Sequence, residues 1–320
     1  MKKRNKAFIT GIAGFAGSYL AERLRADGFA LYGNLGPGET TKNIAGIEAD
    51  IGLERCDILK PDKMSRLLKK VRPDYLFHLA AFASVGKSFE KARIVYDINF
   101  TGTLNLFEAA RAAGGVKKLV FISSSEVYGL FRPKNKTLTE DQPIRPLSPY
   151  GISKAAGEFL AGQYVHGGRL PVTIARSFNH TGPRQATGFV VPDFASQISA
   201  IERGKERPVI KVGDLSARRD LADVRDIVDG YLRLALRGKP GRVYQLSTGR
   251  AVAIDTILDK LMGQATVKIA RKLDRTRLRP ADIPVLRGSS ERAAKELGWK
   301  CRYKLNDTLR DTLNYWREKR

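Results

Sequence analysis

The chain has few cysteines and no long apolar run, and both shortages limit what it can be. Its 320 residues include only two cysteines, Cys56 and Cys301, which lie far apart and lack the spacing of metal ligands. Neither a disulfide framework nor a zinc site is therefore expected, and a reducing compartment such as the cytoplasm fits this composition. No stretch approaches the roughly 20 unbroken apolar residues that span a bilayer, so no membrane segment is expected.

Acidic residues are also in short supply, because 33 acidic residues stand against 57 basic ones and leave a net charge of +24. Such an excess raises the question of nucleic-acid binding. Lysines and arginines are scattered along the whole chain, usually with an acidic residue nearby, and no basic stripe interleaved with aromatic residues occurs. The charge therefore fits a solvated surface that attracts an anionic small substrate better than it fits a nucleic-acid-binding face.

The amino end of the chain has an apolar strand pattern, a glycine-rich turn and a helical pattern in direct succession. Residues 6–10 have the pattern of a short apolar strand, residues 11–17 read Gly-Ile-Ala-Gly-Phe-Ala-Gly, and residues 18–27 have helical apolar spacing. The first glycine permits a tight turn, the second lets the backbone approach a pyrophosphate, and the third lets helix and strand pack closely. Since the helix amides would face the phosphates, the pattern predicts a dinucleotide site.

The next strand is predicted at residues 29–33, and an acidic residue is missing where it ends. An acidic residue at this point would hold the adenosine ribose and favour NAD. Residues 33–36 read Gly-Asn-Leu-Gly and contain neither an acid nor an arginine. The choice between NAD and NADP stays open, with a slight preference for NADP because nothing there repels a 2′-phosphate.

Strand and helix patterns continue to alternate along the chain. Strands are predicted at 74–79, 118–123 and 171–176, with helices at 61–71 and 89–113, the latter being one helix or a broken pair. Such alternation predicts an α/β fold with a Rossmann-like, doubly wound parallel sheet. Residues 1–176 are expected to form the NAD(P)-binding domain and residues 177–320 mainly a smaller α/β substrate domain, with returns to the sheet near 220–246. The smaller domain is predicted to contain a helix at 254–262, a strand at 266–270 and a helix at 305–316.

The candidate chemistry is concentrated between residues 121 and 154. Tyr150 and Lys154 are four residues apart, so a helix would place them on one face, a turn apart. A nearby ammonium group is expected to lower the pKa of a phenol, and a shift from about 10 to neutrality requires about 4 kcal/mol. Ser124 would lie at the carboxyl end of the strand 118–123, where a hydroxyl could share the hydrogen bond to a reacting oxygen. His78, at another strand end, is expected to be a packed histidine.

Together, these motifs resemble the extended short-chain dehydrogenase/reductases that act on nucleotide sugars. The resemblance covers nearly the whole chain and rests on motifs at residues 10–17, 57–58, 78–81, 99, 123–129 and 150–154. It implies that Ser124, Glu126, Tyr150 and Lys154 are catalytic. It also implies that NAD or NADP is held by Gly11, Gly14, Phe15, Ala16, Gly17, Asp57, Ile58, Leu79, Ala80, Ala81, Asn99, Tyr150 and Lys154.

The same resemblance assigns a GDP-linked sugar to the second half of the chain. Asn179 and Arg219 would hold the diphosphate, since a guanidinium group meets phosphate oxygens bidentately. A salt bridge from Arg219 to a neighbouring aspartate, Asp220 or Asp223, is the structural alternative. The remaining residues expected to bind the substrate are Ser125, Glu126, Val190, Arg279 and Asp282.

Within this family, the chain most resembles enzymes that reduce the C4 keto group of GDP-4-dehydro-6-deoxy-D-mannose to give GDP-D-rhamnose. Residues 191–193 read Val-Pro-Asp where related dehydratases have a basic run, which favours reduction. Glu126 stands where dehydratases have their base, so GDP-mannose 4,6-dehydration is an alternative, as is 4-epimerisation of a nucleotide sugar. A sensor or scaffold is disfavoured because Tyr150 and Lys154 are both present. A homodimer is expected through the helices at 89–113 and 149–165.

Overall fold

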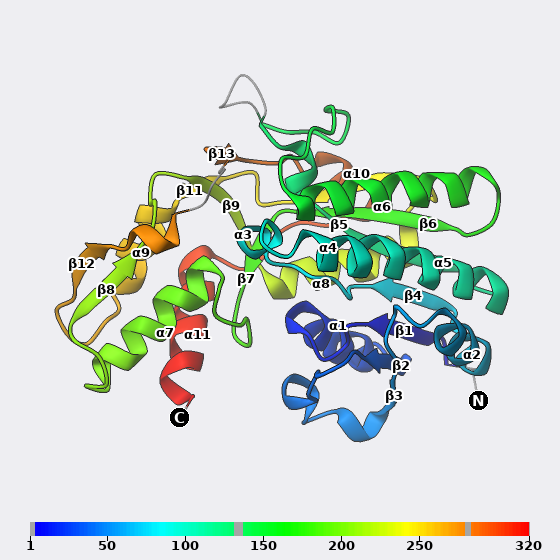
Figure 1. Cartoon of the computed structure of the whole chain (residues 1–320), viewed down its shortest axis with the longest axis horizontal. Coiled ribbons are helices and arrows are strands. Elements are labelled where there is room, and N and C mark those ends of the chain that lie inside the picture. The colour runs from blue at the N-terminus through cyan, green and yellow to red at the C-terminus, as the bar shows by residue number, and fades with distance from the viewer. Residues whose placement is uncertain (1–3, 131–136, 279–282, 320) are drawn as a thin grey trace.

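A seven-stranded sheet forms the centre of the computed structural model, which describes residues 4–130, 137–278 and 283–319 (Figure 1). All neighbouring strands are parallel, and their order is β10-β6-β5-β4-β1-β2-β3. The strands are β1 (Lys6–Thr10), β2 (Ala30–Leu35), β3 (Ile51–Arg55), β4 (Tyr75–His78), β5 (Lys118–Ser124), β6 (Val172–Ser177) and β10 (Val243–Leu246). Because the order runs outward in both directions from the β1–β4 pair, the sheet is doubly wound, and the predicted fold class is confirmed.

Helices cover both faces of this sheet, because alternate side chains of each strand point to opposite sides. In β1, Ala7 and Ile9 belong to one apolar core while Phe8 between them belongs to the other. The first core is completed by α1 (Phe15–Ala26), α8 (Val224–Arg237) and α10 (Glu291–Leu297). The second is completed by α2 (Pro61–Val71), α5 (Gly102–Ala113) and α6 (Pro149–His166).

The segment predicted as one helix or a broken pair at 89–113 is broken. It consists of α4 (Ala92–Tyr96), the π-helical turn η3 (Asp97–Thr101) and α5, and the short helix α3 (Val85–Ser88) precedes it. Asn99 lies in the π-helical turn and is buried. A π-helical turn of this kind changes the direction of the side chains it carries, and such turns are frequent at functional sites.

The smaller part of the molecule lies to the left in Figure 1 and has its own apolar core. Its helices are α7 (Val190–Glu202), α9 (Ile254–Met262) and α11 (Leu305–Glu318). Its strands are β7 (Asn179–Thr181), β8 (Val209–Val212), β9 (Arg218–Asp223), β11 (Ala251–Ala253), β12 (Ala270–Leu273) and β13 (Val285–Leu286). The prediction of a strand at 266–270 was wrong in its bounds. All four residues of β12 are exposed, so the strand has no apolar alternation to mark it.

Several segments beyond residue 176 return to the large sheet. They are α8 and β10, which lie in or beside the predicted returns near 220–246, and also α10 with the buried Trp299. Along the described residues 4–130, 137–278 and 283–319, no helix combines the length and apolarity needed to cross a bilayer.

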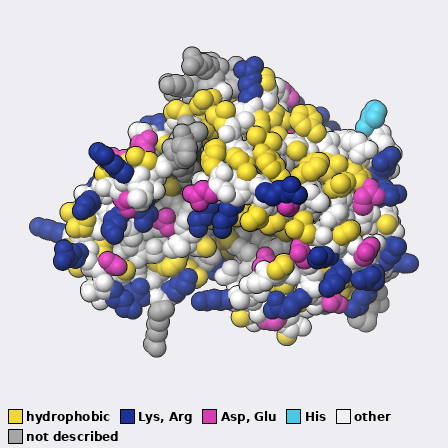
Figure 2. All heavy atoms as spheres, viewed as in Figure 1, with side chains coloured by type: hydrophobic (Ala, Val, Ile, Leu, Met, Phe, Trp, Pro, Cys, Tyr) yellow, Lys and Arg dark blue, Asp and Glu magenta, His cyan; other side chains and the backbone are white. Residues whose placement is uncertain are grey.

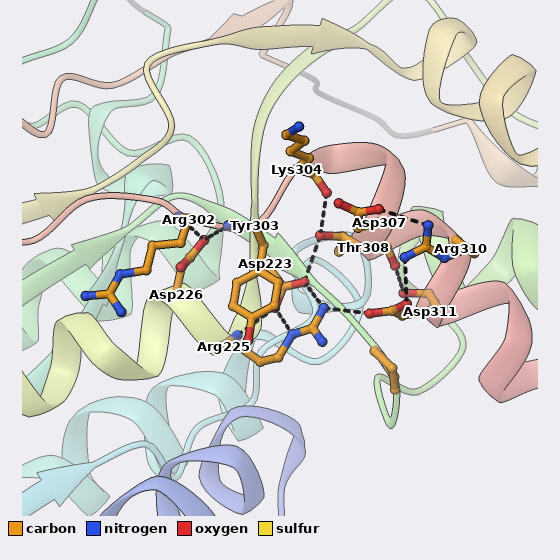
Figure 3. A network of polar contacts seen from close by, with 12 residues as sticks. Asp223, Arg225, Asp226, Arg302, Tyr303, Lys304, Asp307, Thr308, Arg310 and Asp311 are labelled. Carbon is orange, nitrogen blue, oxygen red and sulfur yellow. Dashed lines mark hydrogen bonds and ion pairs between the residues drawn. The ribbon is translucent and has the colours of Figure 1, made fainter.

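A cluster of charged residues joins the two parts of the molecule (Figure 3). Asp223 caps α8 by accepting a hydrogen bond from the Arg225 amide at 2.8 Å, and it accepts another from the Thr308 hydroxyl of α11 at 2.7 Å. The Arg225 guanidinium bonds both to Asp223 and to Asp311 of α11. Since α8 packs on the large sheet and α11 in the smaller core, this cluster fixes the orientation of one part against the other.

Candidate active site

The glycine-rich turn lies at the carboxyl end of β1 and makes close backbone contacts. Gly11 has a φ of +68°, and a Cβ atom there would lie 3.0 Å from the backbone of Ala80. A Cβ atom on Gly17 would overlap the carbonyl oxygen of Gly11. The helix α1 begins at Phe15, earlier than the predicted residue 18, and its N-cap residue Gly14 provides no side-chain hydrogen bond. The glycine-rich turn fits a pyrophosphate for two reasons. The amides at the start of α1 lie beside it, and side chains at the glycine positions would collide with the neighbouring backbone.

A chain of neutral hydrogen bonds supports this turn. The Ala80 amide donates to Thr10 Oγ1 at 3.1 Å, and Thr10 Oγ1 lies 2.8 Å from His78 Nδ1. On the other side of the ring, His78 Nε2 lies 2.8 Å from Thr103 Oγ1, whose proton is donated to the Asn99 carbonyl oxygen. Thr103 can therefore only accept from the ring, which places the proton of His78 on Nε2 and makes Nδ1 the acceptor from Thr10.

His78 is thus the packed histidine that the sequence predicted. Its side chain is buried, and this burial, aided by the charge of Lys154, lowers the pKa of His78 to about 3. The imidazole is neutral over the whole physiological range. It connects β1, β4 and α5 without adding a charge beside the site.

Asn99 extends this series of hydrogen bonds toward α6, the helix that carries Tyr150 and Lys154. Its side-chain oxygen accepts from the Phe82 amide at 2.8 Å, and its side-chain nitrogen donates to the Phe82 carbonyl oxygen and to Ser153 Oγ. Ser153 Oγ in turn donates to the Tyr150 carbonyl oxygen at 2.8 Å. The Asn99 side-chain amide therefore bonds within the protein, where it holds the segment after β4, and its contact with a cofactor stays a prediction.

Ser124, Glu126, Tyr150 and Lys154 come together at the end of β5. Ser124 ends the strand and accepts a hydrogen bond from the Glu126 amide at 3.2 Å. Tyr150 lies in the first turn of α6, which Ser148 caps and which has proline at its first position. Burial raises the pKa of Tyr150 to about 12, with a hydrogen bond from Ser124 opposing the rise and the charge of Glu126 adding to it. The predicted lowering of this pKa is wrong for the structure.

The position of Lys154 explains why the pKa of Tyr150 is not lowered. Its ammonium group donates to the Ile122 carbonyl oxygen of β5 at 2.8 Å and lies 5.9 Å from the centre of the Tyr150 ring. The side chain is buried, and burial lowers the pKa of Lys154 to about 8. The helical spacing placed both groups on one face as predicted, but the lysine is directed to the backbone of the sheet. At neutral pH the pair is a protonated phenol beside an ammonium group.

The other residues predicted to bind the cofactor follow the ends of β3 and β4. The Asp57 carboxylate accepts from the Leu59 amide at 2.9 Å and shapes the turn after β3. The Ile58 side chain is buried against α5, so any contact from Ile58 to a cofactor would come from its backbone. The half-buried segment Leu79–Ala80–Ala81 directly follows β4, beside the glycine-rich turn. Phe15 and Ala16 open α1 and are half-buried.

The residues predicted to bind the sugar nucleotide lie on the smaller part or beside it. Exposed Asn179 opens β7, two residues after Ser177, which pairs with Ser124 in the sheet. Arg219 is buried on β9, the neighbour of β7, and donates to the Ile283 carbonyl oxygen at 2.6 Å. The remaining predicted residues are Ser125, buried in the 3-10 helix η4 (Ser125–Tyr128), Val190, the first residue of α7, and Arg279 and Asp282, which lie outside the described residues.

The structural alternative for Arg219 was a salt bridge to Asp220 or Asp223, and both carboxylates accept hydrogen bonds from other groups. Asp220 accepts from the amides of Thr248 and Gly249 at 2.7 and 2.9 Å, and Asp223 belongs to the joint with α11. The structure also adds residues that sequence reasoning missed, namely Thr10, Thr103 and Ser153. Spacing could have indicated two of them, because Thr103 lies four residues after Asn99, and Ser153 lies between Tyr150 and Lys154.

Comparisons with known proteins agree with this architecture. Residues 8–312 match the family described as GDP-mannose 4,6 dehydratase. The chain is 32% identical to GDP-6-deoxy-D-mannose reductase of Pseudomonas aeruginosa over 97% of both chains. The solved structure of RMD from the same organism, complexed with NADPH, has a TM-score of 0.85 at 31% identity, covering 99% of this chain and 100% of that one. The Thermus thermophilus UDP-glucose 4-epimerase complex with NAD has a TM-score of 0.88 at 27% identity, covering 98% and 100%.

The family match covers nearly the whole chain, and the similar proteins are reductases, dehydratases and epimerases of nucleotide sugars that use NAD or NADP. The resemblance inferred from the sequence is thereby confirmed, together with the class of enzyme and of cofactor. The chain belongs to the GDP-mannose 4,6 dehydratase family and is an NAD(P)-dependent enzyme of the extended short-chain dehydrogenase/reductase type.

Proposed function

We propose that the protein reduces the C4 keto group of GDP-4-dehydro-6-deoxy-D-mannose to a hydroxyl group, giving GDP-D-rhamnose. The observation that carries the proposal is the 32% identity with a GDP-6-deoxy-D-mannose reductase over 97% of both chains. The site chemistry supports it, because the pKa of Tyr150 is raised to about 12 and the phenol is protonated at neutral pH. A reductase requires this state, since its acid must donate a proton to the oxygen that forms at C4.

In this mechanism each residue at the end of β5 has one task. Tyr150 would donate its proton to the C4 oxygen, and the Ser124 hydroxyl, which acts on the Tyr150 phenol, would orient that same oxygen. Lys154, with its pKa near 8, is mostly protonated at neutral pH and would hold the nicotinamide ribose. The nicotinamide, when bound, supplies the hydride that C4 receives, while the protein contributes orientation and electrostatics.

Binding of the two ligands would be divided between the two parts of the molecule. The amides of Phe15, Ala16 and Gly17 would face the cofactor pyrophosphate at the start of α1, while the Gly14 amide closes the turn by donating to the Gly11 carbonyl oxygen at 3.0 Å. Asp57 and Ile58 would lie at the adenine end. Asn179, Arg219 and the segment that contains Arg279 and Asp282 would hold the GDP portion of the substrate, with Ser125, Glu126 and Val190 near the sugar.

Glu126 supports a second candidate, GDP-mannose 4,6-dehydration. Its carboxylate acts electrostatically on Tyr150, so it lies near the group that would hold the sugar C4 oxygen. A base at this point could remove the proton from C5 during elimination of water. In a reductase the same carboxylate would only contact sugar hydroxyl groups. Glu126→Gln therefore separates the two reactions.

The deciding experiment incubates the purified enzyme with GDP-4-keto-6-deoxymannose and NADPH or NADH, and separately with GDP-mannose. Cofactor oxidation is followed by absorbance, and products are identified by NMR. Oxidation with the keto sugar, a product with the D-rhamno configuration at C4, and turnover retained by Glu126→Gln would support the proposal. Formation of the keto sugar from GDP-mannose without net cofactor use, abolished in Glu126→Gln, would make the protein a dehydratase. Interconversion of C4 epimers without net cofactor use would make it an epimerase.

We also infer that the enzyme works as a homodimer through α4, η3 and α6. These elements carry exposed apolar side chains, and Figure 2 shows hydrophobic side chains gathered over this face. The exposed residues are Ile94, Phe100, Ile152 and Phe159, of which Phe159 is 69% exposed. A second copy would cover them. Sedimentation should show a dimer for the wild type and a monomer for Phe159→Glu, whereas a monomeric wild type would contradict the inference.

A further inference from the structure

A buried ion pair lies one turn beyond the catalytic lysine. Glu158 follows Lys154 by four residues and Tyr150 by eight, so all three lie along one face of α6. The Glu158 carboxylate accepts from Arg176 Nε at 2.9 Å and from Arg176 Nη2 at 2.7 Å. Their side chains are only 4% and 5% exposed. A bidentate pair of this kind restricts both distance and orientation, so it ties α6 to β6.

The Glu158 side chain also reaches β5, which carries Ser124. The Ser123 hydroxyl donates to the Glu158 carboxylate from the residue that directly precedes Ser124. One carboxylate on α6 therefore ties the strand that ends in Ser124 to the helix that carries Tyr150 in its first turn.

The arginine extends the connection to the turn that carries Glu126. Arg176 Nη1 donates to the Tyr128 hydroxyl at 2.8 Å and to the Glu140 carbonyl oxygen at 2.9 Å. Tyr128 ends η4, two residues after Glu126, and its hydroxyl donates to the Thr139 carbonyl oxygen at 3.0 Å. The hydroxyl also accepts a hydrogen bond from Gln245 of β10.

Stability alone is a poor explanation for such a network. Taking two charges out of water is costly, and apolar residues of similar volume often stabilise a fold equally well or better. What an apolar pair cannot supply is a set of directional bonds that fixes several elements relative to one another. The elements joined here are those that carry Ser124, Glu126, Tyr150 and Lys154.

We propose that Glu158 and Arg176 are positioning residues, which hold Tyr150 and Lys154 in register with Ser124 and Glu126 without touching the substrate. The proposal rests on the acid role of Tyr150 in the proposed function, but it does not depend on which nucleotide sugar is bound. Displacement of reacting groups by about 1 Å can lower a rate on the order of 10²-fold. Loss of the pair should therefore lower kcat while binding of cofactor and substrate changes little.

The informative variant is the double replacement Glu158→Met with Arg176→Met. It removes both charges together, so neither charge is left buried and unpaired, and it should lower the unfolding temperature less than either single replacement does. We expect kcat to fall on the order of 10²-fold, while KM and the NADPH dissociation constant, measured by fluorescence, change less than about threefold. The isotope effect with NADPH deuterated at the transferred hydrogen should increase. A partly unfolded population would lower the apparent kcat but leave this isotope effect unchanged.

Glu202→Gln is the matched control, because Glu202 and Arg317 form another bidentate pair, located at the end of α7 and α11. It should lower the unfolding temperature and leave kcat unchanged. Wild-type kcat and isotope effect in the double variant would overturn the proposal.

A crystal structure of the double variant provides a test that needs no substrate. Relative to a wild-type crystal structure, we expect the distance between the Ser124 and Tyr150 hydroxyl oxygens to change and the Lys154–Ile122 hydrogen bond to be lost or lengthened. If both are retained, the positioning role is wrong even where the wild type proves to be an active reductase. If the wild type fails to reduce the keto sugar but the variant shows the displacement, the proposed function fails and the positioning role stands.

Discussion

Two networks hold the site from different sides, and they are made of different groups. On the cofactor side, Thr10, His78 and Thr103 form an uncharged chain in which burial keeps the histidine neutral. Beneath α6, Glu158 and Arg176 form a charged pair that is almost wholly buried. Removal of a neutral group leaves an uncharged partner without its hydrogen bond, whereas removal of one charge leaves the opposite charge buried without a partner, which costs more.

One network is neutral and the other charged because the two networks support different parts of the site. A neutral chain adds no field of its own next to the glycine-rich turn, where a pyrophosphate has to bind to backbone amides. The charged pair lies behind β5, where it can fix several elements at once and its two charges largely cancel. Both networks end on α6, one through Ser153 and the other through Glu158.

The largest expected effect comes from Tyr150, the group that both networks orient. Tyr150→Phe removes the proton donor, and we expect kcat to fall by about 10³-fold. The NADPH dissociation constant, measured by fluorescence titration, should stay within about threefold of the wild type. A variant that keeps most of its turnover would show that the proton comes from another group.

A smaller effect concerns stability and the charge of Lys154. Its pKa near 8 in the folded protein lies below about 10.4 in the unfolded chain, so the unfolded chain holds more protons between these values. The free energy of unfolding should therefore rise with pH from about 8 to about 10, by at most about 3 kcal/mol. Lys154→Met should lack this rise, which urea unfolding at pH 7.5 and 10 measures. Lys69→Met, at an exposed lysine of α2, should keep it.

The neutral network is broken by Thr103→Val, which leaves His78 Nε2 as a buried donor without its acceptor. We expect a loss of about 1–3 kcal/mol in the free energy of unfolding. Since the pKa of His78 is about 3, the loss should be equal at pH 5.5 and pH 8. Thr312→Val is the control, because the Thr312 hydroxyl also donates to a carbonyl four residues earlier, at Thr308. A loss at Thr103 no larger than at Thr312 would contradict this role.

The smallest expected effect concerns the choice of cofactor. Arg55 pairs with Leu35 where β2 and β3 end, the region that meets the adenosine ribose in folds of this kind. We expect Arg55→Ser to raise KM for NADPH about tenfold, or about 1.4 kcal/mol, by removing an arginine near the 2′-phosphate. KM for NADH should not change. Equal effects on both cofactors would exclude Arg55 as the determinant.

Much of the cofactor half could be predicted because its signals are local. The glycine spacing, the alternation of strands and helices, and the positions of Tyr150 and Lys154 on one helix face depend on residues close in sequence. Strand β12 was misplaced because its residues are all exposed and show no alternation. Arg279 and Asp282 were named from family resemblance alone, and their roles stay predictions.

By itself, the sequence determined the order of the elements, the presence of a dinucleotide turn and the family of the enzyme, since short-range spacing and composition carry that information. Only the tertiary structure decided the electrostatics of the site. It half-buried Tyr150 and raised its pKa through the loss of solvent around the phenol, it directed Lys154 to a carbonyl of β5, and it paired Glu158 of α6 with Arg176 of β6. A pKa depends on solvent exclusion and on partners distant in sequence, and both exist only once the chain has packed.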